Sequence, residues 1–224
     1  MSIWSRIAAA IAALREGESL SAALSRLRTP PEKSVAFTIA VIALGAKMAK
    51  ADGKVTRDEV AAFRRIFHIP PSEERHAARV YNLARTDVAG FESYARQVAR
   101  MFGPGAPILH DLLEGLCHIA TADGDYHEAE DAFLRRVAEI FGIDAQEFAR
   151  IRARCGAAGD AWAILGLPPG TPMAQARARW RQLVRENHPD HMLARGVPRE
   201  AVKLANDRLA RINRAWEQIR KEAA

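Results

Sequence analysis

A seven-residue pattern that occurs twice is the feature that most limits how this chain can fold. Lys50-Ala-Asp-Gly-Lys-Val-Thr56 and Thr121-Ala-Asp-Gly-Asp-Tyr-His127 each follow an apolar helical stretch and precede another helical stretch. Asp52 and Asp123 are equivalent positions, so the offset is 71 residues. Repetition on this scale indicates that residues 32–155 contain two helix–Ala-Asp-Gly–helix units packed into one bundle.

The composition predicts an all-α protein. Strand-forming residues are few, whereas Ala, Arg, Leu and Glu are abundant. Hydrophobic residues make up 49% of the 224 residues, so a sizeable core is expected in one large or two modest domains. The longest apolar run, residues 34–46, is too short to span a bilayer and suits a central core helix.

Residues 1–31 are expected to form an N-terminal helical extension. Residues 1–16 place Ile3, Ile7, Ile11 and Leu14 on one stripe, which favours a helix packed on the bundle. Peripheral membrane contact through residues 1–16 is the alternative. No secretory signal or transmembrane segment is evident. The only two cysteines form no Cys-x-x-Cys pair and fit a reducing compartment, so a cytoplasmic location is expected.

The last 65 residues have a distinct pattern. A short helix ends at Gly166, and Thr171 and Pro172 are predicted to be the N-cap and first residue of a long basic helix. His188-Pro189-Asp190 follows that helix, then a loop and a second long helix from Pro198. Because proline disfavours helical geometry in the preceding residue, these three side chains should form an exposed bend.

Basic residues are concentrated in this C-terminal part. Residues 160–224 hold 12 Lys and Arg residues against 7 Asp and Glu residues, a net of +5 of the +6 for the whole chain. Arg177, Arg181 and Arg185 are four residues apart and form a basic stripe. Such a stripe binds either nucleic acid or an acidic protein surface. No aromatic platform or known DNA-reading motif accompanies it, so nucleic acid is not the expected partner.

The pattern of residues 160–222 resembles the J domain of DnaJ-type co-chaperones. Trp180-Arg-Gln-Leu183 stands where that family usually has Tyr-Arg-Lys-Leu, and Ile212-Asn-Arg-Ala-Trp216 stands where it has Ile-x-x-Ala-Tyr. His191 departs from the family, which commonly has Lys there. The repeat region is similar to the TerB-like domain of tellurite-resistance-type proteins. A TerB-like region followed by a J domain resembles the DjlA-like co-chaperones, in which a membrane-spanning segment usually comes first.

The resemblance implies a TerB-like targeting or interaction domain at 32–155 and a J domain at 160–224. The residue pattern adds the N-terminal extension at 1–31 and a short flexible linker at 156–159. The implied partner is a DnaK-type ATPase chaperone. Arg177, Arg181 and Arg185 would orient the module on an acidic surface, and His188, Pro189 and Asp190 would make the short-range contacts. ATP hydrolysis would take place in the partner.

The Asp-Gly repeats also suggest a metal site. Asp52 with Glu59, and Asp123 with Glu130, offer the oxygen ligands that a divalent cation prefers. The favoured interpretation is simpler: each Asp-Gly makes a tight turn and each Glu completes a helix cap. No cofactor is expected to be required. The alternative function is a metal-responsive TerB-type scaffold with a weak or inactive J module.

An enzyme is not expected. His188 and Asp190 supply a His–carboxylate pair, which is half of a hydrolase triad. However, the chain has no Gly-x-Ser-x-Gly elbow and no glycine-rich phosphate loop.

Overall fold

The computed structural model describes residues 32–51, 90–121, 126–156 and 160–223, and the single positions 7, 69, 71, 74, 75, 78 and 81. Every regular element in these residues is a helix, which confirms the all-α prediction. The predicted N-terminal extension, apart from position 7, lies outside these residues, as do the helical stretch expected directly after the first repeat and linker residues 157–159. None of the described helices is long and apolar enough to cross a membrane.

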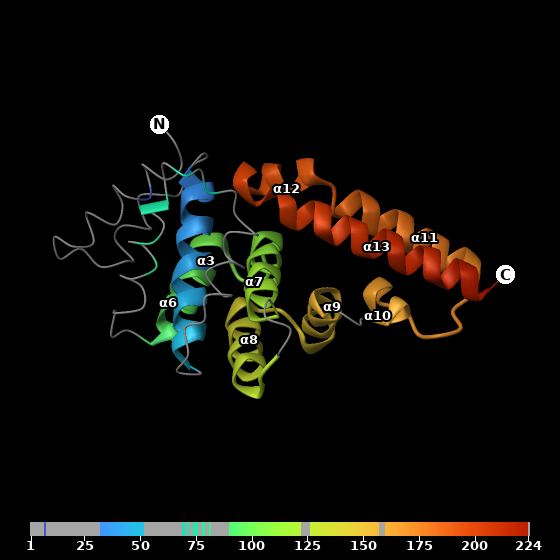
Figure 1. The fold of residues 1–224 in the computed structure, drawn as a ribbon, viewed down its shortest axis with the longest axis horizontal. Coiled ribbons are helices and arrows are strands. Elements are labelled where there is room, and N and C mark those ends of the chain that lie inside the picture. Colours follow the sequence, from blue (N-terminus) through green and yellow to red (C-terminus); the bar gives the residue numbers. More distant parts are fainter. Residues whose placement is uncertain are drawn as a thin grey trace.

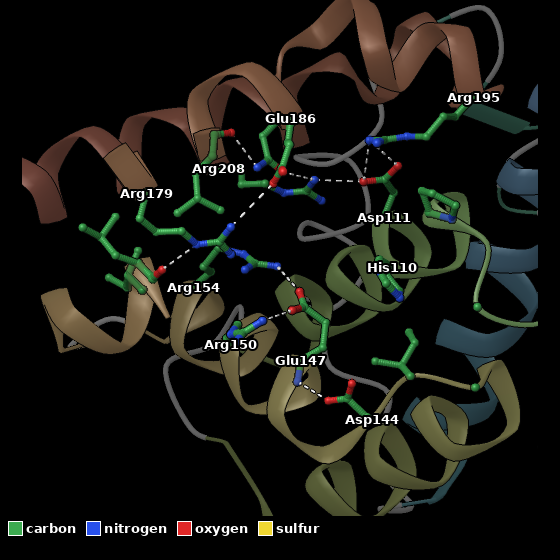
Figure 2. Close-up of a pocket in the computed structure, with 18 residues that line it drawn as sticks. His110, Asp111, Asp144, Glu147, Arg150, Arg154, Arg179, Glu186, Arg195 and Arg208 are labelled. Atoms are coloured by element: carbon green, nitrogen blue, oxygen red, sulfur yellow. Dashed lines mark hydrogen bonds and ion pairs between the residues drawn. The ribbon is translucent and has the colours of Figure 1, made fainter. Parts of the chain in front are cut away.

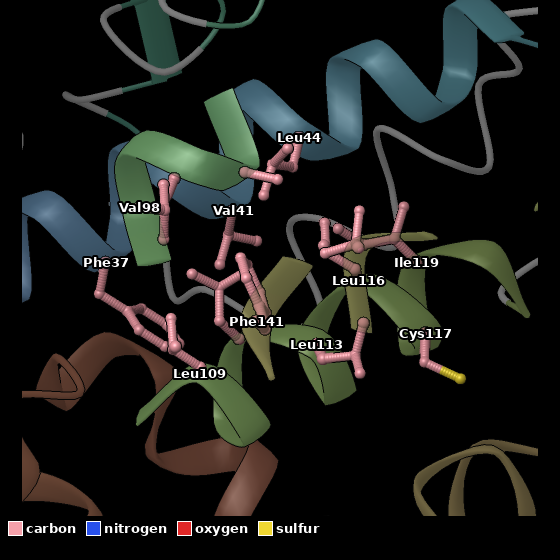
Figure 3. Close-up of a cluster of buried hydrophobic side chains, with 14 of the residues drawn as sticks. Phe37, Val41, Leu44, Val98, Leu109, Leu113, Leu116, Cys117, Ile119 and Phe141 are labelled. Carbon is pink, nitrogen blue, oxygen red and sulfur yellow. The ribbon is translucent and has the colours of Figure 1, made fainter. Parts of the chain in front are cut away.

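Helix α3 (Glu32–Ala51) is the centre of the N-terminal bundle. Every residue from Ala36 to Met48 is buried, so this helix is enclosed on all sides, as its long apolar run predicts. It packs against α6 (Phe91–Phe102), α7 (Pro107–Ala120) and α8 (Glu128–Phe141). Figure 3 shows Val41 and Leu44 of α3 within this buried cluster.

The two helices predicted for the second repeat unit are present as α7 and α8, on either side of residues 121–127. Helix α8 ends at Gly142, whose φ of 73° is left-handed. Helix α9 (Ala145–Cys155) then starts at Asp144, whose Oδ1 accepts a hydrogen bond of 2.8 Å from the Glu147 N–H. The helix expected after the first repeat lies outside the described residues.

The C-terminal part is a helical hairpin. Short helix α10 (Ala161–Leu165) precedes α11 (Met173–Glu186) and α12 (Pro189–Arg195). The 3₁₀ turn η2 (Arg199–Ala201) then leads into α13 (Val202–Glu222). Helices α11 and α13 run side by side, with α10 beneath one end of the pair (Figure 1). The hairpin has its own buried cluster: Ala161, Leu165, Leu183, Ile212, Ala215 and Ile219.

Two local predictions for this hairpin are wrong. Helix α11 begins one residue later than expected, because Pro172 is extended (ψ 135°) and occupies the N-cap position. Thr171 does not cap the helix, since its hydroxyl donates to the Pro168 carbonyl at 2.7 Å. The segment after the bend is also not a loop. It forms α12, because Pro189 occupies the first helical position, where its missing N–H costs nothing.

One end of the hairpin is part of the bundle's core. The buried cluster that contains α3, α7 and α8 also contains Met192, Val197, Ala201, Leu204 and Ala205. A Cβ added at Gly115 of α7 would lie 3.6 Å from Leu204 Cδ1, which is an ordinary van der Waals distance, so Leu204 of α13 packs directly on α7 at this point. The sequence predicts only a linker between the two parts, whereas the structure joins them through a continuous apolar core.

We expect Met192→Ala to destabilise the N-terminal bundle and the hairpin together. Met192 is fully buried in the shared core, so its truncation should cost roughly 2 to 5 kcal/mol of unfolding free energy. Thermal and urea unfolding should shift as one transition. Met173→Ala is the control, because Met173 is half-buried at the far end of α11 and should cost less. Two separate transitions, only one of them shifted by Met192→Ala, would contradict the shared core.

Candidate functional site

The His188-Pro189-Asp190 bend joins α11 to α12. Helix α11 ends at Asn187, whose side-chain amide donates a hydrogen bond of 2.8 Å to the Leu183 carbonyl. His188 is extended (φ −63°, ψ 139°) and is the N-cap of α12. The exposed fraction of the side chain is 55% for His188 and 84% for Asp190. The predicted departure of His188 from the helix and the exposure of the bend are therefore both present.

The His188 side chain is oriented by the next turn of the chain. Its Nδ1 accepts a hydrogen bond of 3.3 Å from the Asp190 N–H and lies 3.4 Å from Asp190 Oδ2. Because Nδ1 acts as an acceptor, the proton of the neutral imidazole is on Nε2. The bend thus offers an N–H donor from His188 and a carboxylate acceptor from Asp190.

The three predicted arginines lie on the exposed face of α11. Arg177, Arg181 and Arg185 are exposed, and none of their side chains forms an ion pair or hydrogen bond with another residue that the structure describes. Arg179, which is not part of this stripe, is half-buried and donates from Nε to the Leu165 carbonyl at 3.3 Å. The four-residue spacing therefore identifies the exposed arginines and leaves out Arg179, whose side chain is hydrogen-bonded within the protein.

Below the bend is a buried arginine that the sequence analysis missed. Arg208 of α13 is only 4% exposed and donates from Nη1 to Asn187 Oδ1 at 2.9 Å. The same guanidinium binds two carboxylates of α7, Asp111 at 2.9 Å and Glu114 at 2.8 Å. The residue just before His188 is thus connected to the N-terminal bundle through one side chain.

Asp111 and Glu114 are each only 1% exposed, and arginines from three elements compensate their charges. Arg195 of α12 lies 3.0 Å from Asp111, and Arg154 of α9 lies 3.2 Å from Glu114. Burial by itself raises the pKa of the Glu114 carboxyl, but the charges of Arg208 and Arg154 outweigh it and lower the pKa to about 2. Glu114 is therefore ionised at neutral pH although it has no access to water.

A cleft of about 520 Å³ lies between the bundle and the hairpin, beside this network. Figure 2 shows Arg150, Arg154 and Glu147 on one wall and Arg179 and Glu186 on the other. Its charged groups are largely paired with one another, as in Arg150 with Glu147 at 2.9 Å. The cleft therefore presents no large excess of either charge to a ligand.

The predicted metal ligands are only partly described. Asp52, Glu59 and Asp123 lie outside the described residues, so the two Asp–Glu sites remain predictions. Glu130 is described and caps α8: its Oε2 accepts a hydrogen bond of 3.0 Å from the His127 N–H. The His127 side chain accepts from the Glu130 N–H in return. This is the capping role that the sequence analysis favoured for Glu130.

The sequence contains a weak signal for the two buried carboxylates, although they were not predicted from it. Asp111 and Glu114 interrupt an otherwise apolar stretch, and a buried carboxylate requires a cationic partner. The partner could not be identified, since Arg208 is 94 and 97 residues away and is one of several arginines in α13.

Known proteins are similar to this chain over most of its length. The family model for tellurite resistance protein TerB matches residues 38–153. The co-chaperone protein DjlA of Coxiella burnetii is 28% identical over 199 residues, which are 78% of this chain and 73% of the relative. The DjlA proteins of Photobacterium profundum and Escherichia coli K12 are 25% and 22% identical, over 85% of this chain and 79% and 81% of theirs. No solved structure matches.

Acid should weaken the structure through Glu114. Its folded-state pKa of about 2 lies below the ordinary 4.5, so its contribution to stability is complete above pH 4.5 and is lost as pH falls toward 2. That contribution is roughly 3 kcal/mol. Urea unfolding of wild type and Glu114→Gln between pH 7 and pH 3 measures it. The gap in unfolding free energy should narrow as pH falls, and a constant gap would contradict the assignment.

The cap on α8 should act independently of metal. Glu130→Ala removes the acceptor for the His127 N–H and should cost about 1 kcal/mol. Glu130→Gln keeps an acceptor and should be close to neutral. Thermal unfolding with and without millimolar Mg²⁺, Ca²⁺ or Zn²⁺ should give the same differences. A metal-induced stabilisation of wild type that both variants lose would instead make Glu130 a ligand.

Proposed function

This chain belongs to the family of the tellurite resistance protein TerB, and we propose that it is a J-domain co-chaperone that stimulates ATP hydrolysis by a DnaK-type chaperone. The exposed His188-Pro189-Asp190 bend at the end of a basic helix is the observation that carries this proposal. Its relatives over most of the chain are named co-chaperone protein DjlA, which supports the same function. In this role the protein acts in the cytoplasm and is not itself the ATPase.

The bend has the rigidity that a contact surface needs. Pro189 fixes its own φ, and the His188 imidazole is already held by the Asp190 N–H. Little conformational entropy therefore remains to be lost when a partner binds. The Asp190 carboxylate, which is largely exposed, is free to accept a charge-assisted hydrogen bond from a basic group of the chaperone.

The arginine stripe supplies attraction over a longer range. Arg177, Arg181 and Arg185 are exposed and lead along α11 to the bend, so an acidic surface that attracts them would be brought to His188 and Asp190. Exposed charges of this kind raise association rates and set orientation more than they add affinity. The bend would then favour the hydrolysing state of the partner by binding it more tightly than the other state.

The TerB domain would serve as the targeting or interaction module. Its α7 forms the inner wall against which the hairpin packs, while α6, which is partly exposed, lies on the side away from the hairpin (Figure 1). A partner bound on that side would leave the bend accessible to the chaperone. The metal-responsive scaffold remains the alternative function, for which no described residue adds support.

His188→Gln should abolish most of the stimulation of a DnaK-type ATPase in single-turnover hydrolysis. The substitution keeps an amide donor but replaces the rigid imidazole, whose Nδ1 accepts the Asp190 N–H, with a flexible side chain, so the donor is no longer held in place and we expect a loss of about tenfold or more. His191→Gln is the matched control, since it changes an exposed histidine one turn into α12 and should retain activity. Equal stimulation by wild type and His188→Gln would reject the proposed function.

A further inference from the structure

We propose that the N-terminal bundle holds the His188-Pro189-Asp190 bend in place, and that Asn187, Arg208, Asp111 and Glu114 are positioning residues for co-chaperone activity. This inference rests on the proposed function, because the activity in question is that of the bend. None of the four residues belongs to the contact surface itself. They would act by fixing both ends of the bend to α7.

The first end of the bend is fixed through Asn187. Its Oδ1 accepts the Arg208 Nη1–H at 2.9 Å, and its amide donates to the Leu183 carbonyl at 2.8 Å. Two bonds from one side chain define the place where α11 ends and therefore the direction in which His188 leaves it. The same Arg208 Nη1 also donates to Asp111 at 2.9 Å. A single nitrogen thus joins the bend to α7.

The second end is fixed through α12, which starts at Pro189. Met192 is fully buried in the bundle's core, and Arg195 lies 3.0 Å from Asp111. Figure 2 shows Arg195 and Arg208 reaching Asp111 from the two helices that follow the bend. Asp111 thereby receives one arginine from α12 and one from α13, and the second of these also binds Asn187 before the bend. With both ends held on α7, the bend cannot turn as a unit without breaking a buried ion pair.

The network can only be complete when the two parts of the chain are docked. Arg208 is 4% exposed, and its charge is balanced by Asp111 and Glu114, both of which belong to α7. Removing one partner of such a buried set leaves an uncompensated charge, which is strongly unfavourable. The position of Arg208, and with it that of Asn187, therefore depends on the bundle and is not a property of the hairpin alone.

The experiment compares two hydrogen bonds that both connect α11 to α13. Asn187→Ala removes the bond to Arg208 next to the bend. Asn213→Ala removes the bond that Trp180 Nε1 donates to Asn213 Oδ1, also 2.9 Å long but away from the bend. Asn187→Asp restores an acceptor for Arg208 without restoring the amide donor to Leu183. All variants are made in the full chain, and thermal unfolding checks that each is folded at the assay temperature.

The first measurement is the ¹⁵N backbone order parameter of His188 and Asp190, which requires no chaperone. It should be near 0.85 in wild type and in Asn213→Ala, and should fall toward about 0.6 in Asn187→Ala. Asn187→Asp should recover most of the difference. Asp111→Asn should also lower the order parameter. The double variant Asn187→Ala with Asp111→Asn should have an order parameter no lower than that of the single variant with the larger effect. Unchanged order in Asn187→Ala would overturn the inference.

The second measurement is stimulation of the chaperone's ATPase. Asn187→Ala should lower the maximal stimulation by about threefold to tenfold, the scale of one lost hydrogen bond. The half-saturating concentration should change less, because the arginine stripe is intact. Asn213→Ala should match wild type. Lost order with full stimulation would overturn the inference, whereas lost order with no stimulation even by wild type would reject the proposed function and leave the positional coupling standing.

Discussion

Two carboxylates buried on one helix determine how the rest of this protein is arranged. Asp111 and Glu114 lie on α7 with 1% exposure each, and an ionised carboxylate without water requires cationic partners. Those partners are Arg154 of α9, Arg195 of α12 and Arg208 of α13. A single helix thus requires three others to pack at defined positions around it, and two of them belong to the C-terminal hairpin.

Such a network contributes more to specificity than to stability. Desolvation of several charges offsets most of their mutual attraction, so an apolar interface of the same size would hold the hairpin equally well. An apolar interface could tolerate a shift of α13 along α7, however. Leu204 packing on Gly115 provides the contact area, while the arginines allow only the register in which each reaches its carboxylate. We regard this as the reason why the corner beside His188 has one position relative to the bundle.

The structure also separates two kinds of arginine on neighbouring helices. Arg177, Arg181 and Arg185 stay in water and are suited to long-range attraction, which salt screens. Arg154 and Arg208 are buried and act at contact distance. The surplus positive charge of the C-terminal part, which suggested an acidic partner, therefore includes residues whose charge is already balanced inside the protein.

Local features of the sequence were sufficient for the all-α class, the end of a helix at Gly166 and the exposed bend at His188. Each depends on residues within a few positions of one another, where spacing and the geometry of proline or glycine act directly. Helix α12 was not predicted because it is short and is stabilised by its Met192, which packs into the core of the N-terminal bundle, a part of the chain that is distant in sequence. The roles of Arg208, Asp111 and Asn187 were decided by tertiary structure alone. Arg208 and Asp111 are 97 residues apart, and the residue pattern of neither helix indicates that they pair. Only the docking of the two helices brings these side chains together.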